Sequence, residues 1–88
     1  MKEVTLKPGG FLSGQKFTLD DKFLSYKNAY GKTAKIPRAA IATAVIEPYK
    51  MGQSILKIIG SGTELVKITM PNLWCEQAQE WIVDNLNS

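Results

Sequence analysis

The feature that most constrains this sequence is an amphipathic segment at its end, residues 72–86. On a helix of about 100° per residue its apolar side chains fall within an arc of about 140°, the width of a core-facing stripe. The stripe consists of Trp74, Cys75, Ala78, Trp81, Ile82 and Leu86. Pro71 blocks helical continuation upstream, and we expect Asn72 to act as the N-cap. The segment therefore predicts one helix that buries a single face.

The two tryptophans of this stripe dominate its apolar area, because each buries about 150–250 Å² when fully covered. We interpret Trp74 and Trp81 as core residues rather than as platforms for stacking a ligand. Cys75 lies in the same stripe, and we expect it to be a small core residue rather than a nucleophile. The apolar face of this helix is thus predicted to stabilise the fold rather than to bind a ligand.

The residues before the helix predict only short strands. Apolar and polar side chains alternate, or β-branched residues gather, in seven runs: 3–7, 16–19, 23–27, 32–36, 41–47, 54–59 and 64–70. Turn residues separate the runs, and we expect a bend or short helical turn at 37–40 and the end of the fifth strand at Pro48. Such spacing is typical of an all-β barrel or sandwich, with the helix covering an open end or face.

The chain of 88 residues is long enough for one domain, residues 1–88, with one modest core. It contains no apolar run of the roughly 18 residues that a membrane span needs. Its first residues show no apolar signal-peptide region, and its single cysteine cannot form an internal disulfide. We expect a cytoplasmic protein, with peripheral attachment to a membrane as an additional hypothesis.

Taken in this order, the strands and the helix resemble the pleckstrin-homology-like domain, in particular its compact bacterial type. Residues 16–19 followed by 23–28 are similar to the second and third strands of that family. Ile36-Pro37 resembles the end of its fourth strand, and Trp81 matches the tryptophan that its helix commonly turns toward the core. The resemblance implies a mainly β fold: a seven-stranded, antiparallel, partly open barrel capped by one C-terminal α-helix.

The resemblance also bears on ligands. Members that bind inositol phosphates carry a lysine, a variable loop, and then a basic residue followed two positions later by arginine. Lys7 and Lys16 match the first two positions, but Thr18 stands where the family has arginine. Many members instead bind proteins or self-associate. The resemblance therefore implies a protein-binding or assembly module rather than a phosphoinositide receptor.

The residue types present in the chain argue against most kinds of enzyme active site. The chain has no histidine, which excludes Ser-His and Cys-His nucleophile systems and histidine metal sites. One cysteine cannot build a zinc site, and the adjacent Asp20 and Asp21 are typical of a turn. We expect no catalytic, metal or cofactor site, no small-molecule substrate and no enzymatic activity.

Basic residues are concentrated in the first half of the chain. Residues 16–38 carry six basic residues against two acidic ones, whereas residues 39–88 carry three against five. A candidate rim for an anion or a partner consists of Lys7, Lys16, Lys27, Lys32, Lys35 and Arg38. The rim is either an ordinary solvated surface or a site for phosphate, lipid head groups or an acidic protein.

Nucleic acid is a disfavoured partner, because no array of alternating basic and aromatic residues is present for stacking bases. The sequence thus predicts a non-enzymatic module for protein binding or self-association. The alternative is an anion-binding module that uses the lysine-rich rim, for example on an anionic membrane surface.

Overall fold

A computed structural model describes residues 3–87. Within these residues the chain forms seven strands, one α-helix and two short 3-10 turns. The strands are β1 (Val4–Leu6), β2 (Lys16–Leu19), β3 (Phe23–Lys27), β4 (Thr33–Pro37), β5 (Thr43–Lys50), β6 (Gln53–Ile59) and β7 (Glu64–Pro71). The helix α1 covers Asn72–Leu86, and the 3-10 turns are η1 (Phe11–Ser13) and η2 (Arg38–Ala40). The mainly β prediction and the bounds of the helix are confirmed.

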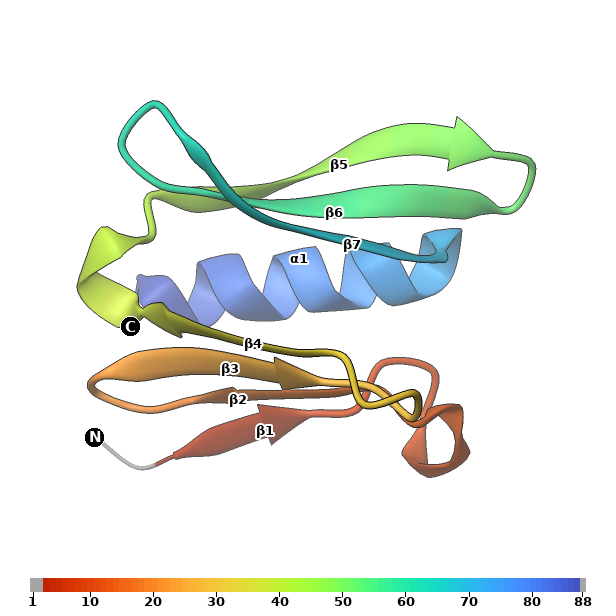
Figure 1. Ribbon diagram of the computed structural model, residues 1–88, viewed down its shortest axis with the longest axis horizontal. Helices are drawn as coiled ribbons and strands as arrows, with labels where there is room; N and C mark the ends of the chain where they lie inside the picture. The colour runs from red at the N-terminus through yellow and green to blue at the C-terminus, as the bar shows by residue number, and fades with distance from the viewer. Residues whose placement is uncertain (1–2, 88) are drawn as a thin grey trace.

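The strands form two antiparallel sheets, one in the order β1-β2-β3-β4 and one in the order β5-β6-β7. The helix α1 lies between them (Figure 1). In the part of the chain described, β4 and β5 do not pair, because η2 follows Pro37 directly and turns the chain from one sheet to the other. The sheets therefore do not close into one barrel.

Alternation along the strands sends one set of side chains to the core. Phe17 and Leu19 of β2 are fully buried, and so are Leu56 and Ile58 of β6. Cys75, Ala78 and Ile82 of α1 are fully buried as well, whereas Trp74, Trp81 and Leu86 are half-buried and pack against this core. The ring centroid of Trp81 lies 6.4 Å from that of Phe17, which joins α1 to the four-stranded sheet.

Two turns follow from polar side chains that fold back on the backbone. Oδ1 of Asp20 accepts the N–H groups of Lys22 and Phe23, each at 2.8 Å, between β2 and β3. Oδ1 of Asn28 accepts those of Tyr30 and Lys32 at 2.9 and 3.0 Å, between β3 and β4. The interpretation of Asp20 as a turn residue is confirmed.

Two local predictions were wrong. Asn72 does not cap the helix with its side chain, because its Oδ1 accepts a hydrogen bond from the hydroxyl of buried Ser54, which needs an acceptor. The strand β5 does not end at Pro48 but continues to Lys50, with a register shift between these two residues. A proline is tolerated there because β5 is the outer strand of its sheet, where an N–H is not required for pairing.

Candidate functional site

Four lysines gather on or beside the outer face of the four-stranded sheet. Lys16 of β2 and Lys27 of β3 are directly opposite each other in the strand register, and both are exposed. They lie outside because their neighbours Phe17 and Tyr26 occupy the inner face. Lys35 of β4 and Lys7, which follows β1, complete this set, which we call the lysine face: Lys7, Lys16, Lys27 and Lys35.

The lysine face contains two shallow hollows that share Lys16 and Lys27. One, of about 440 Å³, is also lined by Lys35 and by the side chains or backbone of Thr18, Ser25, Tyr26, Thr33 and Ala34. The other, of about 320 Å³, is also lined by Lys7 and Phe11 and by Gly14, Gln15, Asn28 and Ala29. None of the residues that line either hollow is acidic. Lys35 interacts electrostatically with Asp20, so the uncompensated positive charge, which attracts anions, is that of Lys7, Lys16 and Lys27.

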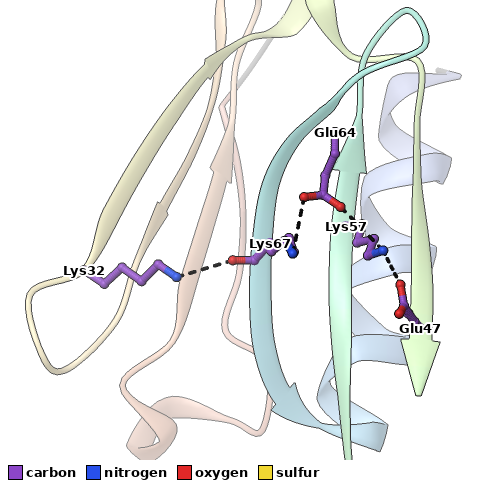
Figure 2. A network of polar contacts seen from close by, with 5 residues as sticks. All are labelled: Lys32, Glu47, Lys57, Glu64 and Lys67. Atoms are coloured by element: carbon purple, nitrogen blue, oxygen red, sulfur yellow. Dashed lines mark hydrogen bonds and ion pairs between the residues drawn. The ribbon is translucent and has the colours of Figure 1, made fainter. Parts of the chain in front are cut away.

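The other two predicted rim residues are placed elsewhere. Nζ of Lys32 donates to the backbone oxygen of Lys67 at 3.3 Å, so its side chain reaches from the β3–β4 turn to β7 (Figure 2). The guanidinium of Arg38 donates to the backbone oxygen of Asn85 at 2.9 Å and to that of Asp20 at 3.3 Å. Arg38 thus binds the C-terminal end of α1, where a cation is favoured by the helix dipole.

The charges of the three-stranded sheet, in contrast, are largely paired with one another. Lys57 forms ion pairs with Glu47 and with Glu64, and Glu64 also lies 3.7 Å from Nζ of Lys67 (Figure 2). The hydrogen bond from Lys57 lowers the pKa of Glu47, and the same bond raises the pKa of Lys57. This sheet therefore has little net charge to offer an ionic partner.

One end of the molecule exposes large apolar side chains. They belong to the β1–β2 loop, the β3–β4 turn, the β5–β6 hairpin and the first turn of α1. Leu12 is 92% exposed, Tyr30 94% and Met51 101%. We call the whole set the apolar end: Phe11, Leu12, Tyr30, Tyr49, Met51 and Leu73.

Specific contacts hold these segments at the same end. Gly9 lies against the indole of Trp74, so that an added Cβ would meet Cε2 at 2.1 Å. Gly14 lies in the same way against Cβ of Ala29, at 2.6 Å. The backbone oxygen of Gly52 accepts the N–H of Asn72 at 3.0 Å. Figure 1 shows η1, the β3–β4 turn, the β5–β6 turn and the start of α1 at one end of the molecule.

Sequence reasoning included the four members of the lysine face among its six rim residues, but it missed the apolar end. Its members lie in four separate segments, and each alone is an ordinary exposed residue. The one local signal was Phe11-Leu12, an apolar pair within a loop that contains three glycines, Gly9, Gly10 and Gly14. Two apolar residues in a glycine-rich loop belong to no strand or helix that could bury them, so their side chains are expected to be exposed.

Among the described residues, the thiol and the possible metal ligands were the groups named by the sequence as candidates for chemistry. Burial raises the pKa of the Cys75 thiol, which disfavours the thiolate, and its Sγ donates to the backbone oxygen of Ser54 at 3.4 Å. No three acidic or thiol side chains among residues 3–87 come together in a way that could hold a metal ion. No helix formed by these residues is long and apolar enough to cross a membrane.

Comparison with known proteins adds no relative. No family model, no curated protein and no solved structure matches the chain. The lysine face and the apolar end are therefore the observations from which a function can be inferred.

Proposed function

We propose that this chain is a non-enzymatic binding module with a pleckstrin-homology-like fold, which attaches reversibly to anionic membrane surfaces in the cytoplasm. The fold assignment is supported by the order of the elements, four antiparallel strands, three antiparallel strands and a C-terminal helix. It is also supported by the tryptophan at position 81, which packs against the core. The attachment uses the apolar end together with the lysine face.

The observation that carries the proposal is the proximity of exposed apolar side chains to uncompensated lysines. Phe11 and Lys7 are in contact, with Nζ of Lys7 4.8 Å from the ring centroid, and both line the smaller hollow with Lys16 and Lys27. Burial of one large apolar side chain contributes about 1.5–3 kcal/mol, and each lysine near an anionic leaflet about 1 kcal/mol. Two such signals together give stable but reversible attachment, whereas one alone is marginal.

The kind of cation indicates what is recognised. The lysine face contains lysine alone, and lysine presents a compact point charge rather than the planar fork with which arginine binds one phosphate in two places. The lone arginine of the chain, Arg38, is engaged at the end of α1. Binding should therefore follow the negative charge density of the membrane rather than the identity of one head group.

Sedimentation with vesicles tests this proposal. The wild-type protein should sediment with vesicles of phosphatidylcholine and phosphatidylserine, remain in solution with phosphatidylcholine alone, and be released by salt. Lys16→Gln/Lys27→Gln and Phe11→Ala/Leu12→Ala should each weaken binding strongly. Lys22→Gln is the matched control, because Lys22 is an exposed lysine in the β2–β3 turn, away from the apolar end, and it should bind like wild type.

Two results would refute the proposal. One is failure of the wild-type protein to sediment with anionic vesicles at low salt. The other is equal binding by Lys22→Gln and Lys16→Gln/Lys27→Gln after correction for the number of charges removed. In the second case binding would depend on net charge and not on this face.

Self-association is a second candidate function, in line with the first hypothesis from the sequence. It is favoured by a row of carboxylates on α1 that lies apart from the lysine face: Glu76, Glu80 and Asp84, all exposed. Light scattering over a wide range of protein concentration tests it. An average mass that rises with concentration is expected, and a strictly monomeric protein would exclude this function.

A further inference from the structure

The outer side of α1 carries an acidic stripe, which consists of Glu76, Glu80 and Asp84. These residues recur at every fourth position, so they lie on one side of the helix with about 6 Å between neighbours and about 12 Å in total. All three are exposed. No ion pair within residues 3–87 joins any of them to a lysine or an arginine. Their charge is therefore available to a partner.

The lysine face has similar dimensions and the opposite charge. Lys7, Lys16 and Lys27 lie in one row across β1, β2 and β3, whereas Lys35 of β4 is opposite Ser25, two positions along the strands from that row. Neighbouring strands are about 4.8 Å apart, so this row of three lysines spans about 10 Å, and Lys35 extends the lysine face along the strands. A helix lying across the strands would thus place each carboxylate of the acidic stripe within reach of a flexible lysine.

One copy cannot pair these two surfaces with each other. The lysine face looks outward from the four-stranded sheet, whereas α1 lies on the other side of that sheet, between it and the three-stranded sheet (Figure 1). The side chains of the sheet's inner face, among them Phe17 and Leu24, fill the space between the two surfaces. Any contact between the stripe and the face must therefore join two molecules.

We propose that the acidic stripe of one copy binds the lysine face of a second copy in a head-to-tail contact; this assignment rests on the proposed self-association. The contact joins two different surfaces, so each added copy leaves one stripe and one face open for the next. It is held by charges that are exposed in the free protein, and it weakens as salt is added. Lys16 and Lys27 serve both this contact and the membrane, so anionic vesicles compete with assembly.

Sedimentation velocity at low salt, with variants that neutralise one surface at a time, tests the contact. Lys16→Gln/Lys27→Gln retains only the acidic stripe, and Glu76→Gln/Glu80→Gln retains only the lysine face. Each variant alone should be monomeric, whereas wild type should form species that grow with concentration. An equimolar mixture of the two variants should form a dimer and stop there, because each partner has one working surface.

Glu47→Gln is the matched control for the loss of a carboxylate, because Glu47 is an exposed carboxylate on β5, outside the stripe. It should assemble as wild type does. All the substituted side chains are exposed, so circular dichroism should show an unchanged fold, and Glu47→Gln, which also loses the ion pair with Lys57, should unfold at a slightly lower temperature.

The possible failures are separable. If wild type assembles and both variants assemble equally well, the protein self-associates, but not through the acidic stripe and the lysine face. If wild type is a monomer at low salt, the proposed contact and the proposed self-association are both wrong. A mixture of variants that stays monomeric also overturns the contact. Glu76→Gln/Glu80→Gln keeps full binding to phosphatidylserine vesicles if the contact is right, so membrane attachment is tested independently.

Discussion

The packing of Gly9 against Trp74 gives the sharpest prediction about stability. Gly9 has φ of +75°, and a Cβ on it would lie 2.1 Å from Cε2 and 2.5 Å from Nε1 of the Trp74 indole. Gly9→Ala therefore carries two costs, about 1–2 kcal/mol for a left-handed alanine and about 1–3 kcal/mol for displacing the indole. The sum, about 2–5 kcal/mol, is a large part of the stability of a domain of this size.

Gly62→Ala is the matched control for this substitution. Gly62 has φ of +77°, but nothing lies within 4 Å of the position of its Cβ, so only the conformational cost of about 1–2 kcal/mol applies. Urea unfolding of both variants measures the difference, and thermal unfolding should show it as about 4–8 °C per kcal/mol. Gly9→Ala should be clearly the less stable of the two.

A double-mutant cycle isolates the contact itself. In a Trp74→Ala background the obstacle is gone, so Gly9→Ala should cost only its conformational term, about 1–2 kcal/mol. Equal destabilisation by Gly9→Ala and Gly62→Ala would refute the packing argument. So would a cost of Gly9→Ala that is the same in the wild-type and Trp74→Ala backgrounds. Either result would mean that the β1–β2 loop is not held against α1 as described.

Three further predictions concern the core and the charges. Trp81→Ala, which removes the ring that packs near Phe17, should lower the free energy of unfolding in urea by about 3 kcal/mol, and unchanged stability would contradict its core role. The thiol of buried Cys75 should react with iodoacetamide only when urea is added; rapid labelling of the native protein would oppose this. The pKa of Glu47 is lowered by Lys57, so its stabilising effect is present above the ordinary carboxyl pKa and is lost as pH falls through the lowered value. The stability gap between wild type and Glu47→Gln should therefore close in acid, and a gap that widened there would contradict the pairing.

The elements themselves could be predicted because their patterns are local. The alternation at 16–19 and 23–27 and the apolar stripe at 72–86 each depend on neighbours within one segment, and the observed bounds agree. The outward position of Lys16 and Lys27 follows from the same alternation, since Phe17 and Tyr26 must point to the core. This much of the candidate site was therefore within reach of the sequence.

What could not be predicted depends on contacts between distant segments. Asn72 is an excellent N-cap by residue type, but only the fold brings Ser54 to its side chain. From the sequence, Arg38 is predicted to be a surface cation. Only the fold brings it next to Asn85 at the end of α1, where it donates a hydrogen bond to the backbone oxygen. The apolar end has the same origin, because residues as far apart as Leu12 and Leu73 meet only after both sheets and the helix have formed.

A fluorophore placed at the apolar end tests the central claim most directly. An environment-sensitive probe is attached to Leu12→Cys, with Ser61→Cys in the β6–β7 turn at the opposite end of the molecule as control; native Cys75 is buried and stays unlabelled (Figure 1). With phosphatidylserine vesicles the probe at position 12 should shift to the blue and brighten, and salt should reverse the change, while the probe at position 61 stays unchanged. No shift at position 12, or equal shifts at both positions, would contradict attachment through this end.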